Sequence, residues 1–117
     1  MNDIENKSSL KMAHVLISGR VQGVFFRVST KEVANNLNLS GWIKNTSTGE
    51  VDAYFVGSEK NIKTILTWCH KGPEHAKVEA VKNIPITQTE KTVLYDIYQS
   101  NKINIETPSS FEIKRTL

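Results

Sequence analysis

Residues 19–27 read Gly-Arg-Val-Gln-Gly-Val-Phe-Phe-Arg and lie between an alternating apolar run and a stretch with helical spacing. Gly19 and Gly23 allow positive φ angles and a close approach of the backbone to a ligand. The N–H groups of such a loop, together with the first turn of the following helix, form a site for anions. Arg27 adds a planar, permanently charged guanidinium that suits two phosphate oxygens. The stretch therefore predicts a strand, a loop that binds a phosphoryl group, and a helix.

This loop differs from the common phosphate-binding motifs. Five residues rather than six span Gly19 to Gly23, and the Gly-Lys-Ser/Thr of a P-loop does not follow. The G-x-G-x-x-G of dinucleotide-binding loops is absent, and no cysteine precedes Arg27 as it would in a thiolate phosphatase. Taken alone, the loop has a second interpretation, a tight strand-to-helix turn with a solvated arginine.

Composition predicts a single globular domain. The chain has 117 residues, 38% of them hydrophobic and 23% charged, enough for one compact core. A net charge of +3 favours small anionic ligands slightly and is weak evidence for nucleic acid. No run has the length of a membrane span, and residues 1–11 lack the apolar core of a signal peptide. The single cysteine, Cys69, excludes an intrachain disulfide and fits a reducing cytoplasm.

Hydrophobic periodicity predicts the order β-α-β-β-α-β followed by a terminal strand. Residues 1–12 are expected to be a flexible tail, with Met1 and Met12 both open as the natural start, and residues 13–117 to form the domain. The predicted strands are 13–18, 41–45, 50–56, 76–85 and 111–115, and the predicted helices are 26–37 and the segment from the N-cap Ser58 to the stop at 71–73.

Two segments fit the periodicities less well. In the fourth strand Val78, Val81 and Ile84 recur at intervals of three, which a bulge or an edge position would explain. Residues 86–110 are predicted as an extended connection, an added strand or a partly disordered segment, since Val93, Tyr95 and Ile97 alternate as in a strand while the polar residues that follow do not.

Two split βαβ units predict an α+β fold, the ferredoxin-like α/β sandwich. Its sheet is mostly antiparallel, and both helices lie on one face. In this topology the loop 19–27 and the end of the second strand lie close together. Asn45, at that end, is either a turn residue or an amide that orients a water molecule, because an amide both donates and accepts hydrogen bonds.

The two stretches 19–27 and 41–45 (Gly-Trp-Ile-Lys-Asn) together resemble the motifs of the acylphosphatase family. Members of that family hydrolyse carboxyl-phosphate anhydrides to carboxylate and phosphate. Phe111-Glu112-Ile113 looks like the closing strand of the family, and the resemblance covers residues 13–85 and 111–115. The tail and the stretch 86–110 depart from the family pattern.

The resemblance implies a metal-independent hydrolase of small acyl phosphates that needs no cofactor. It implies that Arg27 and Asn45 are the catalytic residues, the arginine binding phosphate and the asparagine placing the attacking water. The phosphate-binding residues it implies are Gln22, Gly23, Val24, Phe25 and Arg27. We expect a cytoplasmic monomer whose partners are the acyl phosphate and inorganic phosphate, without nucleic acid or membrane.

Three alternatives stay open from the sequence. The chain could be a module that binds phosphate without turnover. It could bind RNA through sheet aromatics, although the expected aromatic signature is missing. It could also relate to the acylphosphatase-like domains that begin larger carbamoyl-transferring enzymes, although the end at Leu117 favours a free-standing enzyme.

Adjacent Cys69 and His70 suggest a reactive pair, but consecutive helical residues point apart and Cys69 is expected in the core.

Overall fold

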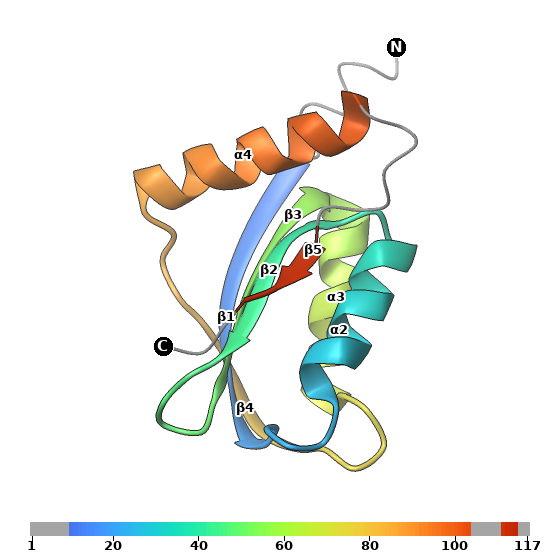
Figure 1. Cartoon of the computed structure of the whole chain (residues 1–117), viewed down its shortest axis with the longest axis vertical. Helices are drawn as coiled ribbons and strands as arrows, with labels where there is room; N and C mark the ends of the chain where they lie inside the picture. Colours follow the sequence, from blue (N-terminus) through green and yellow to red (C-terminus); the bar gives the residue numbers. More distant parts are fainter. Residues whose placement is uncertain (1–9, 104–110, 115–117) are drawn as a thin grey trace.

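The computed structural model describes residues 10–103 and 111–114 (Figure 1). Its strands and helices, in chain order, are β1 (Leu10–Arg20), α2 (Phe26–Asn36), β2 (Ser40–Asn45), β3 (Val51–Ser58), α3 (Glu59–Lys71), β4 (Lys77–Asn83), α4 (Gln88–Ile103) and β5 (Phe111–Ile113).

The strands form one five-stranded sheet in the order β4-β1-β3-β2-β5. Neighbouring strands are antiparallel, except that β5 runs parallel to β2. Helices α2 and α3 cover one face of the sheet, and α4 crosses the other face at the end away from the loop between β1 and α2 (Figure 1). The predicted α+β sandwich is therefore confirmed, with one further helix.

Side chains that alternate along β3 fill two separate hydrophobic clusters. Val51, Ala53 and Phe55 belong to the larger cluster, which packs against α2 and α3 as the alternation predicted. Tyr54 and Val56 point to the opposite face, where they form the smaller cluster with Leu94 of α4. Both faces of this central strand are thus buried, because α4 covers the face that an antiparallel sheet can leave to solvent.

The edge strand β4 explains the spacing of its valines. Ser18 pairs with Ala80 and Gly19 pairs with Val78, so Glu79 is an extra residue at this point of the β1–β4 ladder. A bulge of this kind places residues three apart on the same face. Val78 and Val81 accordingly both pack against the larger cluster, and the prediction of a bulge at an edge position is confirmed.

Residues 88–103 form an α-helix, so none of the structures predicted for this segment is right there. Thr87 and Glu90 make reciprocal hydrogen bonds, from the Thr87 N–H to Glu90 Oε1 (2.9 Å) and from the Glu90 N–H to Thr87 Oγ1 (3.1 Å). This is a capping box, and its Thr-x-x-Glu signature is present in the sequence. Leu94 is fully buried, whereas Val93 and Tyr95 are 42% and 45% exposed, which contradicts the predicted strand alternation.

The predicted boundaries differ from the observed ones mainly at the first and last strands. β1 begins at Leu10, inside the segment predicted as a tail, because Leu10 continues the ladder by pairing with Ser58. β5 ends at Ile113, two residues before the predicted end, and residues 104–110 and 115–117 lie outside the described residues. The predicted N-cap of α3 is confirmed, since Ser58 Oγ accepts from the Asn61 N–H at 3.2 Å.

Candidate active site

The two glycines of the motif both have the positive φ angles that the sequence predicts, Gly19 near the end of β1 and Gly23 in the loop between β1 and α2. Gly19 has a φ of 120°, and a Cβ there would clash with the carbonyl oxygen of Lys77 on β4. Gly23 has a φ of 75° and no atom within 4 Å of an added Cβ, so its conformation alone calls for glycine. The first glycine thus permits close strand packing, and the second shapes the loop.

Phe26 fixes the start of α2 beneath the loop. Its side chain is 1% exposed and lies 5.6 Å from the ring of Trp68 on α3, measured between centroids. The hydroxyl of Thr30 donates to the Phe26 carbonyl at 2.8 Å. These contacts hold the helix end, whose first-turn N–H groups and partial positive charge attract anions, directly beside the loop.

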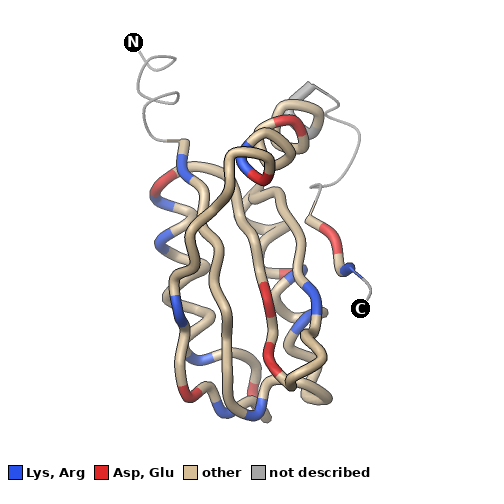
Figure 2. Tube along the Cα trace, turned by 90° about the vertical axis from the view of Figure 1, so that its left-hand side faces the viewer, with Lys and Arg blue, Asp and Glu red and all other residues tan. Residues whose placement is uncertain are grey.

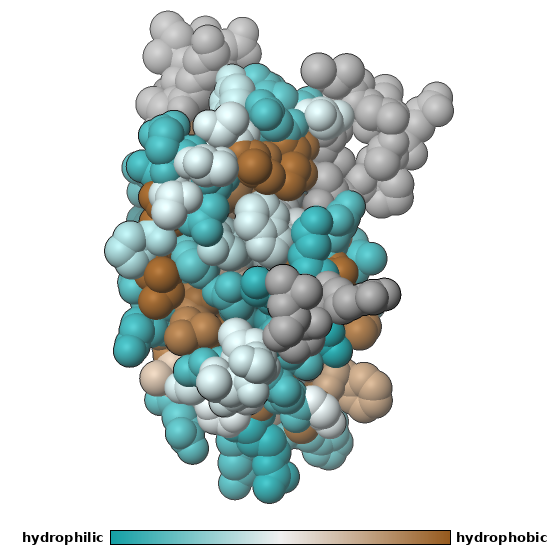
Figure 3. Space-filling view, turned by 60° about the vertical axis from the view of Figure 1, so that its left-hand side comes forward, coloured by the Kyte–Doolittle hydropathy of each residue, from teal (hydrophilic) through white to brown (hydrophobic). Residues whose placement is uncertain are grey.

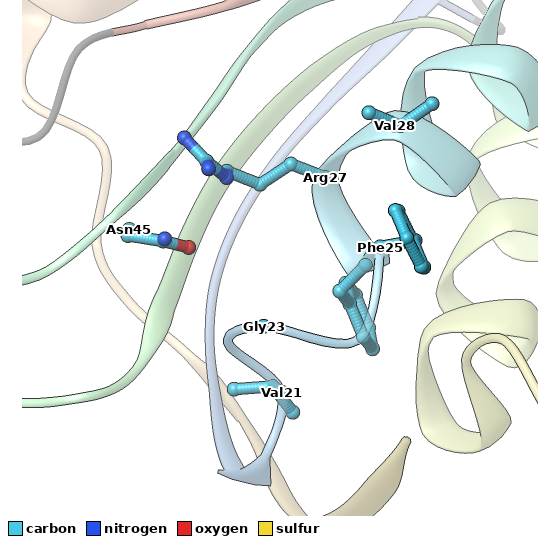
Figure 4. A pocket seen from close by; sticks show the side chains of 7 residues that line it. Val21, Gly23, Phe25, Arg27, Val28 and Asn45 are labelled. Carbon is cyan, nitrogen blue, oxygen red and sulfur yellow. The ribbon is translucent and has the colours of Figure 1, made fainter. Parts of the chain in front are cut away.

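One pocket lies at this helix end, with a volume of about 240 Å³ (Figure 4). This is close to the lower limit for pockets that hold drug-sized ligands, about 300 Å³, and therefore suits a small molecule. Its lining residues come from the loop, the start of α2 and the end of β2, and they are Val21, Gly23, Phe25, Phe26, Arg27, Val28 and Asn45. Among these described lining residues, Arg27 is the only charged one.

Arg27 extends from the first turn of α2 toward the strand that carries Asn45 (Figure 4). None of the salt bridges between described residues involves Arg27. Arg27 is half-buried, and none of the described residues that line the pocket carries a carboxylate to neutralise its charge. The pocket therefore presents an uncompensated positive charge, which favours an anionic ligand.

Asn45 closes β2 and pairs with Val51 in the strand ladder, so it is a strand residue rather than part of the turn that follows. Its side chain points from β2 toward the loop (Figure 4). The Oδ1 atom is buried and has no hydrogen-bond partner in the described part of the chain. A buried acceptor without a hydrogen bond destabilises the fold by about 1–3 kcal/mol. The Oδ1 atom is therefore suited to accept a hydrogen bond from a water molecule or a ligand.

The side chain of Gln22 links the loop to the β2–β3 turn. Its Nε2 donates to the carbonyl oxygens of Thr46 (3.0 Å) and Glu50 (2.7 Å). Thr46 follows Asn45 directly in the chain, so these two hydrogen bonds fix the loop against the strand end that carries the asparagine. The resemblance assigns phosphate binding to the backbone N–H of Gln22, so the hydrogen bonds of its side chain to the turn leave that prediction open.

The structure brings most of the predicted site residues together. Gly23, Phe25, Arg27 and Asn45 line the pocket, while Val24 packs against the larger hydrophobic cluster. Sequence reasoning missed Val21, Phe26 and Val28 as lining residues, although all three lie inside or next to the quoted motif. It also missed the carbonyl acceptors of Gln22, for which the sequence holds no signal because every residue carries a carbonyl.

Cys69 and His70 do not contribute to the pocket. Cys69 is fully buried in the larger cluster, where burial raises the pKa of its thiol to about 12. A thiol in this environment stays protonated and unreactive at neutral pH. His70 lies on the exposed side of α3, and its Nδ1 is 2.9 Å from the Leu66 carbonyl. The prediction that Cys69 is a core residue is confirmed.

Charges of both signs are interspersed along the described part of the chain (Figure 2). Within that part, no three His, Cys, Asp or Glu side chains are grouped in a way that could hold a metal ion. None of its helices has both the length and the hydropathy that a membrane span requires.

Comparison with known proteins identifies the family of the chain. The model of the acylphosphatase family matches residues 13–97. The chain belongs to the acylphosphatase family. The family is one of hydrolases, and the match includes the loop, the start of α2 and the end of β2 that together form the pocket.

Curated relatives and solved structures carry the same family name. An acylphosphatase from Rubrobacter xylanophilus is 47% identical over 79 residues, 68% of this chain and 72% of the relative. One from Syntrophus aciditrophicus is 37% identical over 91 residues, 74% of this chain and 95% of the relative. The structure of an acylphosphatase from Coxiella burnetii superposes with a TM-score of 0.69 at 29% identity, covering 94% of this chain and 98% of that one.

Proposed function

We propose that the chain hydrolyses the carboxyl-phosphate bond of small acyl phosphates to a carboxylate and inorganic phosphate. The observation that carries the proposal is the convergence of the Arg27 guanidinium and the Asn45 amide on one small pocket at a helix N-terminus. Membership of the acylphosphatase family supports the same reaction.

The phosphoryl group binds at the loop in this proposal. Backbone N–H groups of Gln22, Gly23, Val24 and Phe25 donate to its oxygens, and Arg27 adds charge-assisted hydrogen bonds. Phosphoryl transfer passes through a loose transition state with charge spread over three equatorial oxygens. Donors that are already fixed around these oxygens stabilise that charge without reorganisation, which is where most of the rate enhancement arises.

Asn45 places the attacking water. Its buried Oδ1 accepts a hydrogen bond from the water and directs the water oxygen to phosphorus. An amide is no base at neutral pH, so the proton of the water passes to the phosphate product or to solvent. As the new P–O bond forms, the bond from phosphorus to the acyl oxygen breaks and the carboxylate leaves with the electron pair. A carboxylate is a stable leaving group, so the step needs no general acid.

The two hydrogen bonds of the Gln22 side chain fix the position of the loop relative to Asn45. They connect the loop that binds phosphate to the turn after Asn45, so the water and the phosphorus are held by one rigid unit. Fixed orientation of the reacting atoms supplies a large share of the barrier reduction when a site has few chemical groups.

We also propose that the protein works as a cytoplasmic monomer without metal or cofactor, on the acyl phosphate alone and without nucleic acid or membrane. Positive charge from Arg27 and the backbone N–H groups replaces the charge that a metal would supply. Charged residues of both signs interspersed along the described chain (Figure 2) and one buried cysteine agree with this proposal.

The test is the hydrolysis of benzoyl phosphate in EDTA by the parent protein, Arg27→Gln and Asn45→Ala. We expect turnover in the parent, loss of both phosphate affinity and turnover in Arg27→Gln, and loss of turnover alone in Asn45→Ala. An inactive parent that still binds inorganic phosphate through Arg27 would identify a binding module instead. Turnover by the parent that EDTA abolishes would contradict the metal-independent mechanism.

A further inference from the structure

Two exposed apolar side chains stand at the mouth of the pocket. Phe25 is 76% exposed and Val28 is 59% exposed, and both line the pocket that holds Arg27 and Asn45. Large apolar residues this exposed are few in the described part of the chain, where the others are Val93 and Tyr95 on α4. One face of the molecule shows small apolar patches separated by hydrophilic residues (Figure 3). Phe25 and Val28 differ from single exposed apolar residues because both line the same charged pocket, and this calls for an explanation.

Phe25 is an unfavourable choice for local structure. It occupies the N-cap position of α2 in the left-handed region (φ 64°, ψ 25°), and its side chain makes no capping hydrogen bond. Asn, Asp, Ser or Gly would suit an N-cap better, and Asn or Gly would also suit this conformation. An aromatic side chain here gains neither burial nor a cap. Residues that break a local rule without a structural gain are expected at functional sites.

The direction of the reaction points to the same side chains. In phosphoryl transfer the attacking and leaving oxygens lie roughly in line on opposite sides of phosphorus. Asn45 places the water on the side of β2, so the acyl oxygen leaves on the opposite side of the pocket. Phe25 and Val28 lie at the start of α2, on the side away from β2, whereas Arg27 points toward β2 (Figure 4).

We infer that Phe25 and Val28 form an acyl subsite that favours acyl phosphates with an aromatic or branched apolar acyl group. This inference rests on the proposed function, and it adds the substrate class. The acyl group covers the Phe25 ring and the Val28 methyl groups as it binds, and this removes apolar surface from water. Because one methylene in an apolar pocket changes specificity by roughly tenfold or more, the subsite separates benzoyl phosphate from acetyl phosphate.

The test compares kcat/KM for benzoyl phosphate with kcat/KM for acetyl phosphate in the parent, Phe25→Asn, Val28→Ser and the control Val93→Ser. We expect the benzoyl-to-acetyl ratio to fall roughly tenfold in Phe25→Asn and by a smaller factor in Val28→Ser, in proportion to the apolar area removed. Val93 is an exposed helical valine away from the pocket, so Val93→Ser should leave the ratio at the parent value.

Thermal unfolding separates this effect from damage to the fold. Asn tolerates the left-handed conformation and can cap α2, so the Tm of Phe25→Asn should equal or exceed that of the parent. A lower ratio at an undiminished Tm supports the subsite. A parent that hydrolyses both substrates, with an unchanged ratio in Phe25→Asn and Val28→Ser, would overturn the subsite and leave the proposed function standing. A parent that hydrolyses neither overturns both.

Discussion

The pocket beside α2 and the sheet face beneath α4 both gather polar side chains, but they differ in how those side chains are satisfied. Beneath α4, His14 Nε2 lies 2.6 Å from Asp52 Oδ1, and the Tyr54 hydroxyl donates to Glu90 at 2.6 Å. In the pocket, Arg27 has no salt-bridge partner among the described residues and Asn45 Oδ1 has no hydrogen-bond partner there.

The polar side chains beneath α4 are also closely packed. The rings of His14 and Tyr54 stack at 3.8 Å between centroids, and Trp42 stacks on Tyr54 at 4.4 Å. Leu94 closes this aromatic cluster from above and is fully buried. A polar group that meets all its partners within the chain contributes to stability, whereas one held buried without a partner is available to a ligand. We therefore expect changes in the pocket to affect turnover and changes beneath α4 to affect stability.

The largest expected effect on turnover follows from Asn45→Ala. Loss of the water-positioning amide should lower kcat by about 10²–10³-fold, the range for removing one fixed catalytic hydrogen bond. Asn35→Ala is a matched control, because Asn35 Oδ1 is also buried without a partner in the described chain but does not line the pocket. Asn35→Ala should keep the parent kcat. Near-parent rates in Asn45→Ala would refute the assigned role.

On the other face, Leu94→Ala should lower the free energy of unfolding by about 2–5 kcal/mol, since it leaves a cavity beneath α4. The expected kcat of the folded variant equals that of the parent, because α4 lies at the far end of the sheet from the loop (Figure 1). Urea denaturation and turnover at low temperature measure the two quantities. Val93→Ala, on the same helix but exposed, is the control. A large fall in kcat would contradict the separation of the two regions.

Gln22→Met tests whether rigidity connects the parts of the pocket. The substitution keeps the length of the side chain and removes both hydrogen bonds to the turn. Because a displacement of about 1 Å can lower a rate by up to 10²-fold, we expect kcat to fall roughly tenfold while inhibition by inorganic phosphate changes little. Gln99→Met removes the bond from Gln99 Nε2 to the Tyr95 hydroxyl on α4 and should change neither quantity. Equal losses in kcat and phosphate affinity would indicate a collapsed loop instead.

The sequence predicted the pocket better than it predicted the face beneath α4. The pocket depends on local chemistry, since Gly23 and Arg27 belong to one motif and Asn45 ends a strand that periodicity identifies. What could not be read from the sequence depends on where backbone groups meet in space, as in the hydrogen bonds from Gln22 to the carbonyls of Thr46 and Glu50.

The helix α4 was missed for a different reason. Val93, Tyr95 and Ile97 alternate over a short window, and the sequence analysis relied on this pattern without considering the Thr-x-x-Glu signature of Thr87 and Glu90. Their alternation is incidental, because the buried side of the helix is drawn from Leu94 and the half-buried Tyr98, four residues apart. A capping signature at the start of the segment was the better evidence for its structure.

The smallest expected effect is a dependence of stability on acid. The hydrogen bond from the Tyr54 hydroxyl, followed by that from the Thr87 N–H, lowers the pKa of the Glu90 carboxyl below its ordinary value. A carboxyl with a lower pKa in the folded protein stabilises the fold above its unfolded pKa, about 4.3, and this stabilisation is lost as the pH falls through the folded pKa. Burial, followed by the bond to Glu90, raises the pKa of Tyr54, so the phenol stays protonated over this range.

Tyr54→Phe measures this contribution. At about pH 7 the variant should be less stable than the parent by about 1 kcal/mol, the value of one hydrogen bond, and the difference should shrink as the pH falls below about 4. Tyr95→Phe, on the exposed side of α4, should show little difference at any pH. Thermal unfolding of the three proteins across this range checks the expectation. A gap between the parent and Tyr54→Phe that stays constant with pH would mean that the Tyr54–Glu90 bond contributes to stability independently of the charge on Glu90.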